Sequence, residues 1–285
     1  MKNWKTMVGL ALLAGVFLLA GPVPAADDVR LGRKVVPVFQ AINLKLDAEK
    51  SDYTGSVEIR LDVKEPIRVF RLHAQGQQLQ SVDLQGEQGT IRASHHVNEK
   101  GVLSISTEEL LEPGSYRLNI RFQNLFNARA VGLYRMENSG TGYVFSQFEA
   151  TDARRAFPCF DEPIFKIPYQ ITLNIPKGQV AVTNTPLEST AVSGGWTTLT
   201  FRKTRPLPSY LLAMAEGPLE SVAIPGLSVP GRIYTVAGQA HLTEVAAGMT
   251  PRILAALEKF FGRPYPYAKL DLLAIPEYWP GAMEN

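Results

Sequence analysis

Two segments of the sequence concentrate the side chains that could bind a small ligand. The first covers residues 145–163 and contains Glu149 followed by a dense set of charged residues. The second is the pentapeptide 281–285, Gly-Ala-Met-Glu-Asn. A fixed carboxylate can bind a free α-amino group, because an ordinary pKa of about 8 leaves that group largely cationic at neutral pH. Outside such a motif, a lone Glu on an apolar strand is most simply an ordinary surface carboxylate.

The other charged residues of the first segment favour a structural role. Alternating charges in a rigid, proline-bounded loop form a structural ion-pair network more often than an active site. Cys159, the only cysteine of the chain, lies between Pro158 and Phe160 with no His nearby, which predicts a buried, unreactive thiol. The residues of the predicted network are Arg154, Arg155, Asp161 and Glu162.

The sequence contains no recognisable metal site. Zinc peptidases of one large group use His-Glu-x-x-His on a helix, where the two His side chains lie one turn apart on the same face. None of the four histidines, His73, His95, His96 and His241, makes this pattern. His95 and His96 are adjacent, so on a strand they point to opposite faces and are poorly placed to share a metal. We assign no metal ligand and no catalytic residue to this chain.

Both segments resemble the aminopeptidase N family of zinc metallopeptidases. The exopeptidase signature of that family is the same Gly-Ala-Met-Glu-Asn string. Its N-terminal domain carries Gln-x-Glu and then Arg-Arg-x-x-Pro-Cys-x-Asp-Glu-Pro, as residues 147–163 do here. Weaker similarity extends through residues 131–135 and 209–213. The sequence departs from the usual pattern at Leu207-Pro208 and at Tyr267, which look like packing positions.

The resemblance implies substrate-binding residues. Glu149 from the β domain and Glu284 from an edge strand would hold the free amine of a peptide. The backbone groups of Gly281 and Ala282 would bind the substrate main chain, strand beside strand, which explains a glycine at a point of close approach. The implied substrate-binding set is Glu149, Gly281, Ala282, Met283 and Glu284.

The resemblance also implies zinc in the complete enzyme, where it would activate the attacking water. In relatives the zinc motif follows the pentapeptide, whereas this sequence ends at Asn285. We therefore expect an incomplete copy of a secreted metallopeptidase, with no zinc bound to this chain and no activity by itself.

Two other functions remain open. The chain could be a non-catalytic β-domain binding or interaction module derived from the same family. The epoxide-hydrolase branch of the family also resembles this sequence, but it carries Gln where this chain has Glu149. Glu149 therefore favours the aminopeptidase, whose partners would be peptides with a free N-terminus.

The elements that must position the first segment are strands. Apolar and polar residues alternate with a period of two at 42–46, 57–63, 116–122 and 169–175, which is typical of half-buried antiparallel strands. Gly194-Gly195 predicts a hairpin between strands near 180–182 and 196–201. Together these patterns predict an all-β, sandwich-like domain at residues 26–220.

The character of the sequence changes after Pro230. A strand at 232–236 is followed by Thr250-Pro251, which predicts a helix start, and by apolar residues at helical spacing up to Gly262. Another strand begins at Leu270. We expect residues 221–285 to be the incomplete start of an α+β catalytic domain, thermolysin-like by the resemblance.

The N-terminus predicts export. Lys2 and Lys5 precede an apolar run of 14 residues at 7–20 and then small residues, which is typical of a signal peptide at 1–25, cleaved after Ala25. The run is shorter than the roughly 20 residues of a membrane span. We therefore prefer cleavage over a retained anchor, with no stable membrane span afterwards and a periplasmic or extracellular location.

Composition and charge set the broad class. The 285 residues are 45% apolar and 20% charged, a globular composition with material for one large or two ordinary domains. Without Lys2 and Lys5 the 29 basic residues become 27, which balances the 27 acidic ones. That balance leaves no electrostatic case for a nucleic-acid partner.

Overall fold

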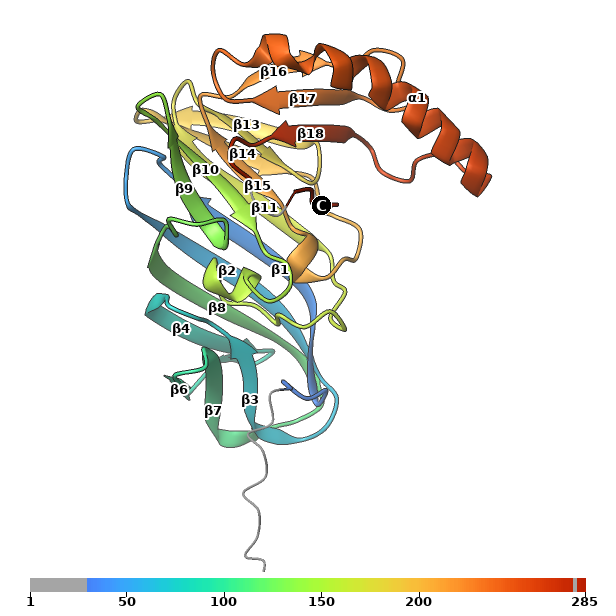
Figure 1. The fold of residues 1–285 in the computed structure, drawn as a ribbon. Coiled ribbons are helices and arrows are strands. Elements are labelled where there is room, and N and C mark those ends of the chain that lie inside the picture. Colours follow the sequence, from blue (N-terminus) through green and yellow to red (C-terminus); the bar gives the residue numbers. More distant parts are fainter. Residues whose placement is uncertain (1–29, 279–280) are drawn as a thin grey trace, which may run out of the picture. The chain divides into compact units, whose positions relative to one another are not determined.

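The computed structural model describes residues 30–278 and 281–285. The predicted signal peptide lies outside the described residues. Residues Leu31–Asn285 form one compact unit (Figure 1). Strands dominate up to residue 220, which confirms the all-β prediction for this region. No helix in the described part of the chain is both long and apolar enough to cross a membrane.

A large mixed sheet forms the first layer. Its strand order is β13-β14-β11-β1-β2-β8-β4-β5, and the pairing of β1 with β11 is parallel. Gln40 in β1 lies opposite Tyr169 in β11, so the middle of this sheet joins distant parts of the chain. The strands are β1 (Val35–Lys45), β2 (Asp52–Val63), β4 (Gln78–Gly86), β5 (Gly89–Ile91), β8 (Gly114–Leu125), β11 (Tyr169–Pro176), β13 (Leu187–Ser193) and β14 (Trp196–Phe201).

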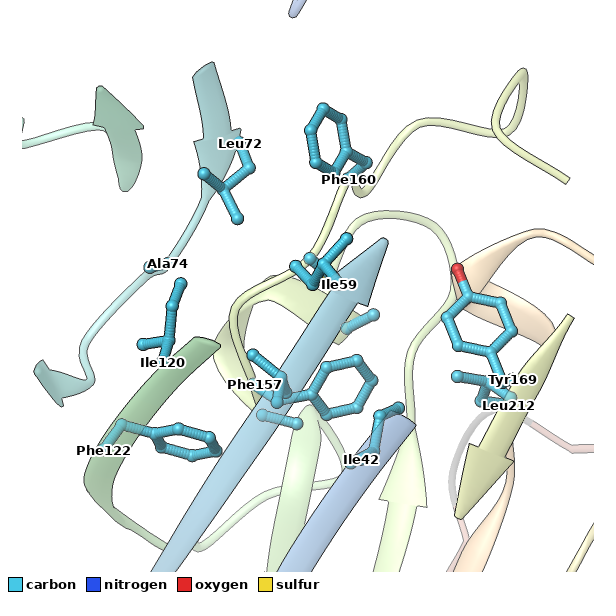
Figure 2. Close-up of a cluster of buried hydrophobic side chains, with 14 of the residues drawn as sticks. Ile42, Ile59, Leu72, Ala74, Ile120, Phe122, Phe157, Phe160, Tyr169 and Leu212 are labelled. Atoms are coloured by element: carbon cyan, nitrogen blue, oxygen red, sulfur yellow. The ribbon is translucent and has the colours of Figure 1, made fainter. Parts of the chain in front are cut away.

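Two smaller sheets share one hydrophobic core with the large sheet. The core contains Ile59 and Ile120 of the large sheet, Leu72 of β3 and Val144 of β10. Figure 2 shows Phe157, from the loop after β10, in the same cluster as these side chains of the large sheet. The smaller sheets are β3 (Ile67–His73), β7 (Val102–Leu111) and β6 (Ala93–Val97), and β12 (Val180–Thr183), β15 (Met214–Gly217), β10 (Thr141–Gln147) and β9 (Gly132–Asn138).

The period-two pattern is confirmed in this core. In β2, Val57, Ile59 and Leu61 are at most 2% exposed, while Arg60 between them is exposed. Full burial of one such aliphatic side chain contributes about 1.5–3 kcal/mol. Alternation along several strands therefore selects one face for the core and one for solvent.

The predicted hairpin at Gly194-Gly195 exists, but one of its predicted strands was wrong. Both glycines have positive φ, and they join β13 to β14. The predicted partner, β12, instead pairs with β15 in the four-stranded sheet. Every residue of β13 is exposed, so the strand has no buried face, and alternation gave no signal for it.

The region after residue 220 forms a third small sheet with one helix. Its strands β16 (Glu220–Ala223), β17 (Gly231–Thr235) and β18 (Leu270–Ala274) run in that order, and β17 is parallel to β18. Helix α1 (Glu244–Phe261) makes the crossover between the parallel strands. Tyr234 and Leu273 pack against the cluster that contains Tyr143 and Phe145 of β10. This contact joins the third sheet to the four-stranded sheet.

The helix starts earlier than predicted. Thr250-Pro251 lies inside α1, which begins at Glu244. Pro251 has no N–H to donate to the preceding turn, and the Thr250 hydroxyl donates to the Ala246 carbonyl at 2.7 Å. The predicted end at Gly262 is confirmed, because Gly262 adopts the left-handed conformation and its amide bonds the last turn.

One face of α1 is apolar and uncovered. Leu254, on another side, is 7% exposed, whereas Phe260 is 81% exposed. The uncovered residues recur three or four positions apart, so they form a single stripe. The stripe consists of Leu242 before the helix and Val245, Met249, Ile253, Leu257 and Phe260 within it.

The turn at residues 46–51 between β1 and β2, called the β1–β2 turn below, contacts the four-stranded sheet. The Gly142 amide in β10 donates to the Glu49 carboxylate at 3.2 Å. Arg135 Nε in β9 donates to the Ala48 carbonyl. A Cβ on Gly142 would collide with the Ala48 backbone, so only glycine allows this approach.

We expect Gly142→Ala to destabilise the fold, because the added methyl meets backbone that cannot rotate away. Overpacking of this kind costs about 1–3 kcal/mol, occasionally more. Urea denaturation measures the change. Gly248→Ala is the matched control, since Gly248 lies in α1 with open space around it and the change should be neutral or stabilising. Equal stability of wild type and Gly142→Ala would contradict the packing described.

Candidate functional site

Glu149 is exposed two residues after the end of β10. The preceding Phe148 is fully buried and packs edge-on against Phe157 with ring centroids 5.7 Å apart. Its carbonyl accepts the Asp152 amide at 2.9 Å, which closes a turn. The buried aromatic ring therefore fixes the backbone from which the Glu149 carboxylate reaches solvent.

A buried ion pair holds the rest of this loop. Asp161 is 2% exposed, and its Oδ2 accepts Arg154 Nε at 2.8 Å and the Arg154 amide at 3.2 Å. The other oxygen accepts the Ser209 hydroxyl at 2.5 Å. Ser209 begins the short helix η2 (Ser209–Leu211). The pair thus ties the Glu149 loop to η2.

The remaining charges of the loop also have structural partners. Arg155 Nε pairs with Asp152 at 2.8 Å, and Glu162 accepts the Leu31 amide at 2.9 Å. With the pair of Arg154 and Asp161, these contacts confirm the structural interpretation of the charged residues.

Tyr278 is influenced by Glu149, and Tyr134 by Tyr278. Burial raises the pKa of Tyr278, and the Glu149 carboxylate raises it further, so the phenol and carboxylate are electrostatic neighbours. Burial also raises the pKa of Tyr134 in β9, with a smaller contribution from Tyr278. The buried Tyr134 hydroxyl has no hydrogen-bond partner among the described residues. Tyr278 therefore links Glu149 to the segment that precedes the pentapeptide.

The pentapeptide is largely exposed and lies outside every described strand. Gly281 has φ of 90°, which favours glycine, and its amide donates to the Tyr278 carbonyl at 3.4 Å. Asn285 Nδ2 donates to the Leu212 carbonyl at 3.4 Å. Leu212 directly follows η2, so both predicted segments are anchored around this short helix.

The structure brings only part of the predicted set together. The Glu149 carboxylate acts on Tyr278, but no hydrogen bond or ion pair among the described residues joins Glu149 to residues 281–285. The expectation that Glu284 lies on an edge strand was wrong, because β18 ends at Ala274. Pro276, between that strand and the pentapeptide, lacks the amide that a continued strand would donate.

The described residues do not fit a metal. No group of three or more His, Cys, Asp or Glu among them could hold an ion. His95 and His96 are both exposed on β6. His73 is buried, and that burial lowers its pKa to about 4, assisted by Arg154. Because no ligand set is present, no catalytic step is assigned to a metal on these residues.

Cys159 is fully buried, and burial raises the pKa of its thiol well above the ordinary value. This confirms the predicted burial of the thiol, and the raised pKa disfavours the reactive thiolate form. A surface depression of about 660 Å³ lies on the large sheet around Asn43, Glu58 and Arg121, and none of the predicted site residues lines it.

Sequence reasoning missed Tyr134 and Tyr278. Tyr278 lies three residues before Gly281, and Tyr134 lies in the segment 131–135 noted for weaker similarity. Their positions next to the motifs were visible. Their contact depends on packing between the third sheet and the four-stranded sheet, which no local pattern encodes.

Comparisons with known proteins agree on one family. Residues 36–211 match the family model described as the peptidase M1 N-terminal domain. The chain is 34% identical over 286 residues to glutamyl aminopeptidase of Bos taurus, which covers 93% of this chain and 30% of that protein. It is 32% identical over 285 residues to aminopeptidase M1-A of Oryza sativa subsp. japonica, covering 94% and 32%. The chain thus spans about a third of the length of these relatives.

We expect Asp161→Asn to cost about 3 kcal/mol or more, because it leaves Arg154 without its buried counter-ion. Asp152→Asn is the matched control: its partner Arg155 has a side chain that is 41% exposed, and exposed pairs contribute about 0–1 kcal/mol. Denaturation of the two variants at pH 7 measures the difference. Similar losses in both would show that the buried pair does not hold the loop.

Proposed function

Because the chain belongs to the peptidase M1 family through its N-terminal domain, we propose that it is the amine-binding N-terminal part of a zinc aminopeptidase. The complete enzyme would hydrolyse the first residue from peptides with a free N-terminus. The observation that supports the proposal is that the Glu149 carboxylate raises the pKa of Tyr278, because this relates one family segment to the residues just before the other.

The proposed chemistry is recognition of a cation. The exposed Glu149 carboxylate accepts hydrogen bonds from the α-ammonium group, which is largely protonated at neutral pH. The Tyr278 phenol lies within electrostatic reach of the same carboxylate. Glu284 supplies a second carboxylate, and Gly281, Ala282 and Met283 contact the first residues of the peptide. Together they would measure one residue from the amine to the scissile bond.

The proposed domain boundary is near residue 220, where the third sheet begins. The unit of β17, α1 and β18 supports an α+β fold there, and we propose that it belongs to a thermolysin-like catalytic domain. The apolar stripe on α1 supports this, because a contiguous uncovered apolar face is typical of a contact surface. Zinc and the groups that activate water would be supplied by other parts of the complete enzyme.

We also propose that residues 1–25 direct export and are then removed, which places the enzyme in a periplasmic or extracellular compartment. The support is the sequence pattern of these residues, in which Lys2 and Lys5 precede an apolar run. The single cysteine is compatible with an oxidising compartment, because the chain has no second cysteine with which it could form a disulfide.

One observation favours a second candidate function. All buried members of the main hydrophobic core lie at or before Met214, so the β domain has a core of its own. It could therefore serve as a non-catalytic binding module. The two candidates differ in whether the amine-binding carboxylates affect turnover of peptide substrates.

We expect the purified chain to contain no stoichiometric zinc and to release no N-terminal residue from a chromogenic amide, because its described residues offer no ligand set. Metal analysis after dialysis and an activity assay with added zinc measure both points. One tightly bound zinc per chain, or clear turnover, would contradict the proposed division of roles.

In the complete enzyme we expect Glu284→Ala and Glu149→Ala each to lower kcat/KM for free-amine peptides. Truncating one partner of a buried charged contact costs about 2–5 kcal/mol, or roughly 30-fold to several thousandfold. Glu188→Ala, on the exposed edge strand β13, is the matched control. Substrates with an acetylated N-terminus should react equally slowly with all four proteins. Unchanged kcat/KM in both site variants would favour the binding module.

A further inference from the structure

Glu216 is a carboxylate in an apolar position. It lies in β15, between Val144 of β10 and Ala181 of β12 in the register of the four-stranded sheet. Its side chain shares a face with Met214, which belongs to the main core. Glu216 is fully buried, and neither carboxylate oxygen has a hydrogen-bond partner among the described residues.

The β1–β2 turn brings two more carboxylates towards Glu216. Burial raises the pKa of Glu216 to about 7, and the negative charges of Asp47 and Glu49 add to that rise. The Ala48 amide lowers the pKa in part, although it does not reach hydrogen-bond geometry. Ionisation of Glu216 would therefore add a buried negative charge close to those of Asp47 and Glu49, which is unfavourable.

The other elements around Glu216 supply little positive charge. The strands β10 and β12 contain no charged residue. Arg135 of β9 is the cation that contacts the turn, and it donates to the Ala48 carbonyl and pairs with Glu137 at 2.9 Å. Arg135 is thus already shared between two acceptors.

The same turn is attached to the sheet by few bonds. The Glu49 carboxylate accepts the Gly142 amide, Arg135 holds the Ala48 carbonyl, and Ala48 is 3% exposed. These contacts hold Asp47 and Glu49 on the sheet near Glu216, where their charges raise its pKa. The protonation state of Glu216 is therefore coupled to the seating of the turn.

We propose that Glu216 is a pH-dependent latch between the β1–β2 turn and the four-stranded sheet. When Glu216 is neutral, the turn is seated with Asp47 and Glu49 near it. When Glu216 loses its proton, its buried charge repels both residues and demands water, so the turn lifts from β10 and β9. Strand β10 starts beside the latch at Gly142 and ends two residues before Glu149, so the latch and Glu149 lie at opposite ends of this strand.

The direction follows from proton linkage. The seated state binds the Glu216 proton more tightly than a solvated state does, since the ordinary pKa of Glu is 4.5 and the pKa of Glu216 in the seated state is about 7. The stabilisation that the Glu216 proton gives to the seated turn is fully present below about pH 4.5 and is lost as the pH rises through about 7. Between pH 5.5 and 8.5 these two values predict that the seated population weakens about thirtyfold relative to the lifted one.

Hydrogen exchange at the Gly142 amide reports the latch directly, because its acceptor is the Glu49 carboxylate of the turn. After correction for intrinsic exchange, we expect protection at Gly142 to fall about thirtyfold between pH 5.5 and 8.5. Protection at Ile59, inside β2, should stay constant. In Glu216→Gln, which cannot ionise, protection at Gly142 should not depend on pH.

Two further variants complete the test. Asp47→Asn removes one of the charges that raise the pKa of Glu216. The fall in protection should therefore be smaller than in wild type and should be complete at a lower pH. Glu87→Gln, an exposed carboxyl remote from the turn in sequence, should behave as wild type. The same pH dependence at Gly142 in wild type, Glu216→Gln and Asp47→Asn would overturn the proposal.

Discussion

The buried pair of Arg154 and Asp161 is the interaction on which the geometry of the candidate site depends. One carboxylate group accepts the Arg154 side chain, the Arg154 amide and the Ser209 hydroxyl. It therefore connects the loop after β10 with η2, and η2 in turn lies beside the carbonyl that holds Asn285. A buried charge is costly to desolvate, yet here a single pair fixes two segments that are distant in sequence.

The strands of the first domain could be predicted because burial of one face of a strand requires an alternation of apolar and polar residues, which is visible in the local sequence. A half-buried strand must alternate, and residues 57–63 do so with Val57, Ile59 and Leu61 inside. The exceptions have the same cause. Strand β13 has no buried face, so the sequence carries no periodic signal for its place beside β14. Thr250-Pro251 is typical of a helix start, but Pro251 lies inside α1, and only tertiary context decides that.

The candidate site was predictable only in part. The motifs identified Glu149 and residues 281–285, because those residue types occur in a fixed order. The neighbours of Glu149 were not predictable, since Tyr134 and Tyr278 meet through packing of separate sheets. Glu216 shows the same limit. In the sequence it is one acidic residue in an apolar stretch, whereas in the fold its burial and the charges of Asp47 and Glu49 in the β1–β2 turn raise its pKa.

The parallel pairing of β1 with β11 has a consequence for biosynthesis. Strand β1 is among the first elements to leave the ribosome, but Ile42 and Leu44 pair with Ile171 and Leu173. The antiparallel neighbours β1 and β2 can associate early, whereas the other edge of β1 stays open until more than a hundred further residues have been translated. During that interval an apolar strand edge is exposed. A nascent chain of this design is therefore open to wrong strand pairing until β11 has been translated.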